Sequence, residues 1–518
     1  MVSKHLKRFV RYTGENLNSL GLIGLIHNCR YLGIDEVQLV ENASRSLSDF
    51  ISKTDSSGKV VVVCSPGFEG AVALAAARNL QKEKEVGIFI LSGPSGNERS
   101  FAKALIPIEK STFFDVVRSA EEGREGLARL LDGNLTILEA ISETGHLYTD
   151  SLRYVLRAIY GYREKHRLRT KVISLNYPRR VERIKLGDGL SQEPDYIFSL
   201  HKRGYGLEGL RSKVVVREIG IPIEAELFSG PGDMLSAYIP RHREYDKRMS
   251  GKVVVIGGSK KYHGAPVLAA HAVNNTLIAM KIGAGFARLY VPETILNAAR
   301  SLSPNIIVSR LGNTHLEEGD VAFVKQDIES SNALVIGMGL GKEKETADAV
   351  MAIFDIAKSL NKKTVIDADA IGVINDYGKL WPNAIITPHE NEFKSIAEEP
   401  PDEEHLYDRA SAAVREAREL NAIVVLKGHN TIVTDGERVK INGASTAALA
   451  TMGTGDILSG IIGGYAAAGA DSFVSAVAGV HLHSIIGDSL GVDYGKHVIA
   501  QDVLNDISKT LRVIERLT

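Results

Sequence analysis

The residues best suited to chemistry lie in the segment LATMGTGDILSGIIGG, residues 449–464. Gly453 and Gly455 allow the backbone to approach a ligand closely, and the helix expected to start near Asp456 offers unpaired N–H groups there. Together these features predict an anion hole of backbone amides. An acid at such a helix terminus would repel a phosphate unless it served a purpose, so Asp456 is predicted to be a general base beside a phosphoryl or hydroxyl group. The alternative is that Asp456 only caps the helix.

Four more segments of the second half place glycines or polar side chains directly after apolar runs. They are VVVIGGSKKYHGAPVLAA (253–270), LVIGMGLG (334–341), IDADAI (366–371) and AIITPHENEF (384–393). Each glycine loop alone could be a tight turn, Asp367 and Asp369 could bind a metal or cap a helix, and His389 could be structural. As a group they favour a ligand site, because ligands of open α/β sheets bind beyond the carboxyl ends of the strands.

These segments follow short Val- and Ile-rich runs that alternate with helical patterns along the chain. The runs are apolar without alternation, as expected for parallel strands covered by helices on both faces, and they predict an α/β fold. The predicted strands are 59–64, 86–91, 135–139, 171–175, 195–200, 213–219, 252–256, 286–291, 333–337, 364–367, 384–387, 423–427 and 431–434. A break rich in glycine, proline and charge at 228–251 divides the chain into two predicted domains, 1–228 and 229–518.

The composition is that of a globular protein and argues against several classes. Of 518 residues, 44% are hydrophobic and 24% charged, and a formal net charge of -1 gives no reason to expect binding to nucleic acid or to an acidic membrane. The two cysteines, Cys29 and Cys64, make no disulfide framework and favour a reducing compartment. The basic start has no apolar region behind it, and the apolar tract 461–487 is predicted to form buried helices, not a membrane span. A cytoplasmic location is expected.

The segments of the second half, taken in order, resemble one family as a set. GGSKKYHGAP, GMGLG, DADAI, TPHENEF, KGHNT (427–431) and ATMGTGDILSG are similar to the motifs of the nucleotide-dependent NAD(P)H-hydrate dehydratases, which have a ribokinase-like α/β fold. The resemblance covers essentially all of 229–518. Met338, Met452 and Asn391 stand where Pro, Gly and Gly are commoner, and none of these departures removes a charged or nucleophilic group.

What the resemblance implies is repair of hydrated nicotinamide cofactors. ADP or ATP would phosphorylate the hydroxyl group of NAD(P)H hydrate, and elimination would restore the ring; Asp456 would deprotonate that hydroxyl while nearby amides stabilise the developing charge. By the family's pattern the substrate contacts are Ala265, Gly339, His389 and Asp456, and the nucleotide contacts are Lys427, Gly428, His429, Asn430, Thr431, Gly453, Thr454 and Gly455. Mg²⁺ is expected to bridge the phosphates. A homo-oligomer is also expected.

The first domain resembles the NAD(P)H-hydrate epimerases, Rossmann-like three-layer domains often fused to these dehydratases. The resemblance lies in GIDEVQLVENASRSLSDFI (33–51), REIGIP (217–222) and the loop within KVVVVCSPGFEGAVALAAARNL (59–80). Epimerases carry a loop like GPGNNGGDG, then an aspartate, then DIPSG. Here Phe68 and Glu69 replace the paired asparagines, Glu139 replaces the aspartate, and NYPRR (176–180) replaces DIPSG.

These replacements leave the activity of the first domain open. Asn176 takes the place of an acid, and an amide cannot accept a proton at neutral pH. The potassium site of the family would keep only Glu69 and Glu139. The domain could be a degenerate scaffold, a dinucleotide-binding site through Gly67 and Gly70, or an epimerase with substituted acids. For the whole chain, the alternatives are a ribokinase-superfamily small-molecule kinase and a non-catalytic dinucleotide-binding protein.

Overall fold

The chain forms two compact units, each built on its own sheet. The computed structural model describes residues 7–14, 16–55, 57–91, 103–104, 114–117, 127–141, 149–176, 191–207, 209–237, 251–279, 285–302, 304–399, 405–443 and 446–515. One unit, here the N-terminal unit, spans Glu15–Pro222. The other, the C-terminal unit, joins Met1–Gly14 to Ile223–Thr518. The division therefore falls at Pro222, slightly before the break predicted from composition. The segment before Glu15, which was predicted to belong to the first domain, belongs to the C-terminal unit.

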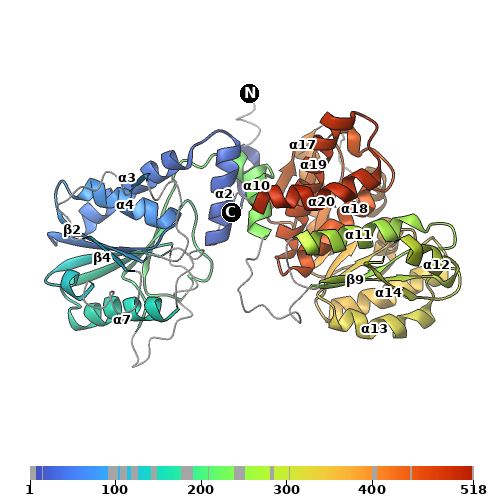
Figure 1. Ribbon diagram of the computed structural model, residues 1–518, viewed down its shortest axis with the longest axis horizontal. Coiled ribbons are helices and arrows are strands. Elements are labelled where there is room, and N and C mark those ends of the chain that lie inside the picture. Colours follow the sequence, from blue (N-terminus) through green and yellow to red (C-terminus); the bar gives the residue numbers. More distant parts are fainter. Residues whose placement is uncertain are drawn as a thin grey trace. The chain divides into compact units, whose positions relative to one another are not determined.

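The N-terminal unit is a parallel sheet between layers of helices (Figure 1). Its seven strands have the order β3-β2-β1-β4-β5-β6-β7, and the direction of chain progression reverses between β1 and β4. The elements that build it are α2 (Ser19–Tyr31), α3 (Glu36–Thr54), β1 (Lys59–Cys64), α4 (Phe68–Leu80), β2 (Glu85–Leu91), β3 (Phe114–Val117), β4 (Leu135–Ala140), α7 (Thr149–Lys165), β5 (Thr170–Leu175), β6 (Tyr196–Leu200) and β7 (Lys213–Arg217). Helices α3 and α4 pack on each other, and α7 packs through Leu156 and Ile159 on a cluster that includes Val61 and Ile137.

The C-terminal unit has a larger sheet, ordered β10-β9-β8-β11-β12-β13-β14-β15-β16. Strands β8 to β14 are parallel, and a final hairpin of β15 and β16 runs antiparallel. The strands are β8 (Lys252–Ile256), β9 (Phe286–Val291), β10 (Ile307–Arg310), β11 (Ala333–Ile336), β12 (Lys363–Ile366), β13 (Ala384–Ile386), β14 (Ile423–Leu426), β15 (Thr431–Thr434) and β16 (Val439–Asn442). The predicted α/β class is therefore confirmed in both units.

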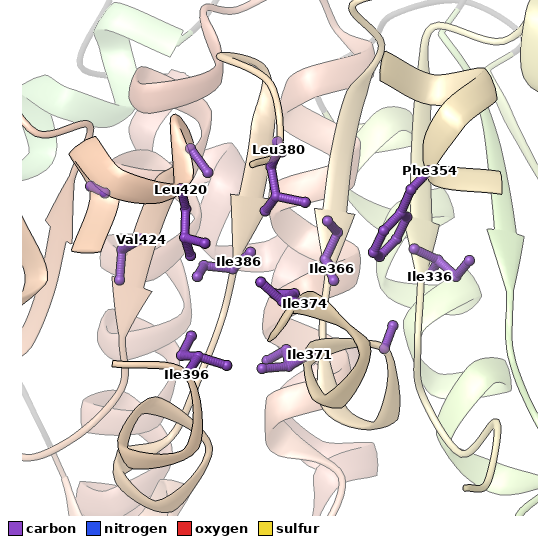
Figure 2. Packing of buried hydrophobic residues seen from close by; sticks show 14 of the residues in the cluster. Ile336, Phe354, Ile366, Ile371, Ile374, Leu380, Ile386, Ile396, Leu420 and Val424 are labelled. Carbon is purple, nitrogen blue, oxygen red and sulfur yellow. The ribbon is translucent and has the colours of Figure 1, made fainter. Parts of the chain in front are cut away.

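Helices cover both faces of this sheet (Figure 1). The helices are α9 (Ile223–Leu227), α10 (Pro231–Ala237), α11 (Gly264–Ala279), α12 (Glu293–Leu302), α13 (Val321–Ser330), α14 (Lys344–Ser359), α15 (Ile374–Tyr377), α16 (Glu390–Ile396), α17 (Leu406–Leu420), α18 (Thr454–Ala467), α19 (Ser472–Tyr494) and α20 (Ala500–Glu515), with short 3-10 turns η1 (Lys7–Tyr12), η3 (Glu318–Asp320), η4 (Ala368–Val373) and η5 (Ala447–Leu449). On one face, side chains of β11 to β14 pack against α14, η4, α15 and α16, with Phe354, Ile371 and Ile396 among them (Figure 2).

The opposite face is covered by α11, α18 and α19, whose sequences are rich in glycine and alanine. A Cβ atom on Gly460 of α18 would lie 2.2 Å from the carbonyl oxygen of Ala269 in α11, so the two helices meet nearly backbone to backbone. The apolar tract 461–487 is thus divided between two buried helices. Among the described residues, α19 is the one helix long and apolar enough to cross a membrane, and 78% of its most apolar window is buried within the structure.

The N-terminal residues of the chain form part of the C-terminal core. In η1, Phe9 and Tyr12 are 2% and 6% exposed and join the cluster that contains Leu334 and Phe354. The rings of Phe9 and Tyr407 of α17 pack in a T-shaped pair with 5.3 Å between centroids, and Arg11 donates a hydrogen bond to the Tyr407 hydroxyl at 2.7 Å. The C-terminal unit is therefore discontinuous in sequence.

Candidate active site

The polar segments identified in the sequence meet at one edge of the C-terminal sheet. The loops after β8, β11, β12, β13 and β14 all leave the carboxyl ends of parallel strands. The strand order reverses between β8 and β11, and such a switch point opens a crevice in α/β sheets. Ala265 opens α11 after β8, and Gly339 lies in the loop after β11, so these two predicted substrate contacts flank the switch point.

The GTGD segment forms the first turn of α18, as predicted. Gly453 precedes the helix with φ of +93°, a conformation that favours glycine, and the first helical hydrogen bond runs from Ile457 N to Gly453 O at 3.2 Å. The Thr454 hydroxyl donates to carbonyl groups of Leu449 at 2.7 Å and Thr451 at 2.8 Å, which anchors the turn. The Thr454 N–H donates to Thr451 O at 3.4 Å, so Gly455 and Asp456 supply the amides of this turn that can bind an anion.

Asp456 lies in this first turn and does not cap the helix through its side chain. The residue is half-buried. Burial and the neighbouring Asp367 carboxylate raise the pKa of Asp456 to about 7, while the Lys427 ammonium group opposes the rise. A carboxylate with a pKa near neutrality can both hold and release a proton under ordinary conditions, which is what a general base requires.

Asp367 forms the centre of a buried charge network at the end of β12. Its side chain is 3% exposed and accepts hydrogen bonds from Lys427 Nζ at 3.1 Å and from the Ser459 hydroxyl of α18 at 2.7 Å. Burial alone would raise the pKa of Asp367, yet Lys427 and the hydroxyl groups of Ser459 and Thr387 lower it below the ordinary value. Asp367 thus stays ionised beside Asp456, and it is neither a side-chain cap nor part of a metal cluster among the described residues.

Asp369 supports the second glycine loop. Its Oδ2 atom accepts a hydrogen bond from the backbone N–H of Gly341 at 2.9 Å, which ties the loop after β11 to the turn after β12. Ala368, between the two aspartates, has φ of +48°, a left-handed conformation that a residue with a Cβ rarely adopts. Strained backbone of this kind persists where the surroundings hold it in place, and here it directs two successive acids to different partners.

His389 has a structural role that the sequence left open. Its Nδ1 atom accepts hydrogen bonds from the backbone N–H groups of Asn391 and Glu392 at 3.1 and 3.2 Å. The Glu392 carboxylate in turn accepts a hydrogen bond from the backbone N–H of His389 at 2.8 Å. This reciprocal capping box starts α16 and leaves the proton of the neutral ring on Nε2. The side chain is 53% exposed, and its Nε2 atom lies 3.5 Å from Glu392 Oε1, so the predicted substrate contact would compete with this carboxylate for Nε2.

The predicted nucleotide loop, Lys427–Thr431, connects β14 to β15. The Lys427 backbone N–H donates to Pro388 O at 2.9 Å, and the Thr431 hydroxyl donates to Gly428 O at 3.3 Å. A Cβ atom on Gly455 would lie 3.8 Å from Lys427 Nζ, so the lysine points to the first turn of α18. The structure therefore brings the two predicted nucleotide-binding segments together, although they come from different elements.

The acids near this loop suit an ion held chiefly by phosphates. The described residues contain no group of three or more His, Cys, Asp or Glu side chains arranged to hold a metal ion by themselves. Asp367 and Glu392 lie 3.1 and 4.0 Å from Lys427 Nζ. Mg²⁺ with a nucleotide usually takes one or two carboxylates and completes its shell with phosphate oxygens and water, so this donor set fits such an ion.

The corresponding site of the N-terminal unit has the same glycine-led helix start, but its acidic side chains are buried and hydrogen-bonded to other residues of the unit. Gly67 precedes α4 with φ of +135°, and Phe68, Glu69 and Gly70 form the first turn of that helix. Glu69 is 1% exposed and accepts a hydrogen bond from Asn176 Nδ2 at 3.3 Å. The remaining residues of NYPRR lie outside the described part of the chain.

Glu139 lies on β4, on the face covered by α7. It is fully buried, and its Oε2 atom accepts a hydrogen bond from the Tyr160 hydroxyl at 2.8 Å. Burial raises the pKa of Glu139 to about 7, and the bond from Tyr160 opposes the rise. Potassium binding by Glu69 and Glu139 stays a prediction, since each acid is engaged by a different neighbour.

Sequence reasoning missed two members of the C-terminal site. Ser459, one turn beyond Asp456, donates its hydroxyl proton to Asp367, and Arg409 is a buried cation of α17 that contacts the nucleotide loop. Ser459 lies within a run of small residues that is typical of simple helix packing. Arg409 could have been noticed because it falls on the apolar face of α17 together with Ala413 and Leu420, where a charge needs a partner.

Comparisons with known proteins match both units to one repair system. Residues 253–509 match the family model described as NAD(P)H-hydrate dehydratase, and residues 36–163 match that of the YjeF-related protein N-terminus. A bifunctional NAD(P)H-hydrate repair enzyme Nnr from Pyrobaculum aerophilum is 29% identical over 520 residues, covering 96% of this chain and 98% of that protein. The protein of the same name from Methanothermobacter thermautotrophicus is 29% identical and covers 93% of each chain.

Among solved structures, an ADP/ATP-dependent NAD(P)H-hydrate dehydratase from Bacillus subtilis, co-crystallised with ATP/Mg²⁺ and soaked with CoA, is 22% identical. It covers 56% of this chain and 98% of that chain, with a TM-score of 0.43.

Proposed function

The chain carries the two family domains of the NAD(P)H-hydrate repair enzymes, and we propose that its C-terminal unit dehydrates NAD(P)H hydrate at the expense of ADP or ATP. The observation that carries the proposal is Asp456 in the first turn of α18, with its pKa raised to about 7 beside the buried Asp367–Lys427 pair. Full-length relatives named for both repair activities favour this function over a small-molecule kinase and over a non-catalytic binding protein.

In the proposed reaction, Asp456 takes the proton of the hydrate hydroxyl group while the oxygen of that hydroxyl group attacks the terminal phosphoryl group of the nucleotide. The amides of the first turn of α18 stabilise the charge that develops there, a contribution of roughly 3–4 kcal/mol per well-placed donor. The phosphorylated hydroxyl is then a good leaving group, and its elimination as phosphate, with loss of a ring proton, restores the double bond. Mg²⁺, when bound, would neutralise charge on the phosphates.

The residues around Asp456 supply binding and orientation. Lys427 faces both Asp367 and the helix start, so its ammonium group is placed to meet a phosphate when the nucleotide arrives. Ala265 and Gly339 lie on either side of the switch point, and the small Ala265 side chain would leave room for the hydrated ring, whereas the missing side chain of Gly339 accommodates Tyr262. The Nε2–H of His389, which now lies 3.5 Å from Glu392 Oε1, would donate to a polar group of the substrate in place of that carboxylate.

For the N-terminal unit we extend the proposal to epimerisation of the R hydrate, the partner activity of the relatives that carry both domains. Support comes from the match over residues 36–163 and from the positive φ of Gly67 at the start of α4. The acids available are Glu69 and Glu139, each engaged by a neighbouring side chain, so a slow reaction is expected.

One assay tests both parts of the proposal. Purified S and R hydrates are offered separately to the full chain with ADP or ATP and Mg²⁺, and the absorbance of the reduced nicotinamide is followed together with phosphate release. We expect the S hydrate to be converted at once. Conversion of the R hydrate faster than its spontaneous epimerisation, even if slower than conversion of the S hydrate, supports epimerisation. Conversion at the spontaneous rate refutes it, and no conversion of either hydrate would overturn the dehydratase assignment.

A further inference from the structure

A buried arginine lies directly beneath the predicted nucleotide loop. Arg409 is in the first turn of α17, and its side chain is only 5% exposed. Its Nη1 atom donates a hydrogen bond to the carbonyl oxygen of Asn430 at 2.9 Å, and Nη2 donates to that of Lys427 at 3.3 Å. A single guanidinium group thus holds both ends of the backbone segment 427–430.

The loop is shaped to lie on this guanidinium group. Gly428 has φ of +158°, and a Cβ atom on it would lie 2.5 Å from Arg409 Nη2. Any other residue at 428 would push the loop off the arginine or the arginine out of its site. The rigid fork of arginine donors can bond two carbonyl groups at once, which the single ammonium group of a lysine does less well.

The same guanidinium group reaches the neighbouring loop. Arg409 Nη2 lies 3.5 Å from Glu390 Oε1, and Glu390 is the residue that follows His389 at the start of α16. A buried cation is costly unless carboxylate and carbonyl groups compensate it, and here the compensating groups come from the loops after β13 and β14. These are the loops predicted to contact the hydrated cofactor and the nucleotide.

We propose that Arg409 is a positioning residue for nucleotide binding: it fixes the backbone of residues 427–430, and Glu390 holds the guanidinium group in place. The inference rests on the proposed function, because only that function makes a nucleotide the ligand of this loop. Loss of the arginine frees the loop, and the nucleotide then has to order it on binding, which lowers affinity. The hydrate is affected less, because no contact of Arg409 reaches three of its four predicted contacts, Ala265, Gly339 and Asp456.

The experiment compares substitutions of two arginines on the same helix. Arg409→Met removes the fork, Arg409→Lys keeps the charge, and Arg415→Met is the matched control, because Arg415 is partly exposed and pairs with Glu399 at 3.3 Å, away from the loop. ADP affinity is measured by calorimetry on the full chain without hydrate. We expect about tenfold weaker ADP binding for Arg409→Met, a smaller loss for Arg409→Lys, and none for Arg415→Met.

Kinetics separate positioning from a general loss of structure. The KM for ATP should rise in Arg409→Met in step with the ADP dissociation constant, while the KM for the S hydrate stays within about twofold and kcat at saturating ATP falls little. If Arg409→Met fails to fold, Arg409→Lys and Glu390→Gln take its place, the latter at a partly exposed site. Both should weaken ADP binding and raise the KM for ATP, by less than Arg409→Met would. ADP affinity equal to that of the unmodified chain in these two variants would overturn the inference.

The outcome is distinguishable from failure of the proposed function. A chain that binds ADP but converts no hydrate refutes the dehydratase, and the affinity comparison between Arg409 and Arg415 variants still decides the role of Arg409. A chain that binds no ADP overturns both.

Discussion

The two units use the same local arrangement, a glycine of positive φ followed by a helix with an acid in its first turn, and they surround that acid differently. In the C-terminal unit Gly453 precedes α18 and Asp456 is half-buried beside Asp367 and Lys427. In the N-terminal unit Gly67 precedes α4, and Glu69 is 1% exposed and bonded to Asn176. The backbone of an anion-binding turn can therefore be retained while the charges that would do chemistry are redirected into the core.

This contrast also separates two ways of raising the pKa of a carboxyl group. Asp456 and Glu139 both have a pKa of about 7, and burial is the largest cause in each. Asp456 has charged neighbours of both signs and partial access to solvent, whereas Glu139 is fully buried under Tyr160. A substrate can reach Asp456 directly, whereas Glu139 could act on a substrate only after the Tyr160 side chain moves aside.

The largest expected effect is on turnover by Asp456→Asn. Loss of the base should lower kcat for the S hydrate by about 10³-fold, while ADP affinity stays within about twofold, because the amides of α18 remain. Stopped-flow absorbance and calorimetry measure the two quantities. Glu69→Gln is the matched change in the other unit and should leave conversion of the S hydrate unchanged; an equal loss in both variants would remove the distinction between the two turns.

A second effect concerns stability and pH in the N-terminal unit. The pKa of Glu139 is raised from 4.5 to about 7, so the folded state prefers its protonated form. The stabilisation that protonated Glu139 gives is complete below pH 4.5 and is lost as the pH rises from there through about 7. The free energy of unfolding falls by about 3 kcal/mol over this interval. Glu139→Gln has no charge to gain and should flatten this dependence.

Hydrogen exchange of β4 amides between about pH 5 and 8, corrected for intrinsic rates, follows the N-terminal unit in that experiment. The fluorescence of Trp381, the single tryptophan, follows the C-terminal unit and should not respond to Glu139→Gln. If the exchange of β4 depended on pH equally in the unmodified chain and in the Glu139→Gln variant, the prediction would be contradicted.

The smallest expected effect is a shift of the pH profile by Asp367→Asn. Asp456 must be ionised to act, so activity rises with pH through its pKa. Removing the charge of Asp367 takes away a cause of the raised pKa and leaves Lys427 to favour the Asp456 carboxylate. The acid limb of kcat/KM should move about one pH unit lower, with about a tenfold loss on the plateau. Asp369→Asn alters only the hydrogen bond from the Gly341 N–H, so the pH at which kcat/KM falls on the acid side should stay unchanged.

Most of the sheet could be predicted because its strands are buried on both faces. The runs 59–64, 252–256, 286–291 and 431–434 coincide with β1, β8, β9 and β15, and the other predicted strands differ at their ends by a residue or two. Strands β3, β10 and β16 were missed. All three lie at a sheet edge, where pairing on one side only leaves a weaker apolar signal than in a central strand.

The site was predictable in its residue types but not in its pairings. The sequence indicated that Asp367, Lys427 and Asp456 follow strands or start a helix, and parallel strands bring such positions to one edge. It could not show that Asp367 bonds Lys427 and Ser459, because these contacts join β12, β14 and α18, far apart in the chain. His389 was predicted from the sequence to contact the substrate, and its role as a helix cap became visible only in three dimensions.

The packing of η1 into the C-terminal unit has a consequence for synthesis on the ribosome. Arg11 and its partner Tyr407 are 396 residues apart, so at translation rates of roughly 5–20 residues per second the first segment waits about 20–80 s for the surface it covers. The N-terminal unit can fold in that interval, whereas Phe9 and Tyr12 stay exposed until α17 has been made. Nascent chains should therefore expose Phe9 and Tyr12, two aromatic side chains within a basic segment, and burial of these rings reports that synthesis has passed α17.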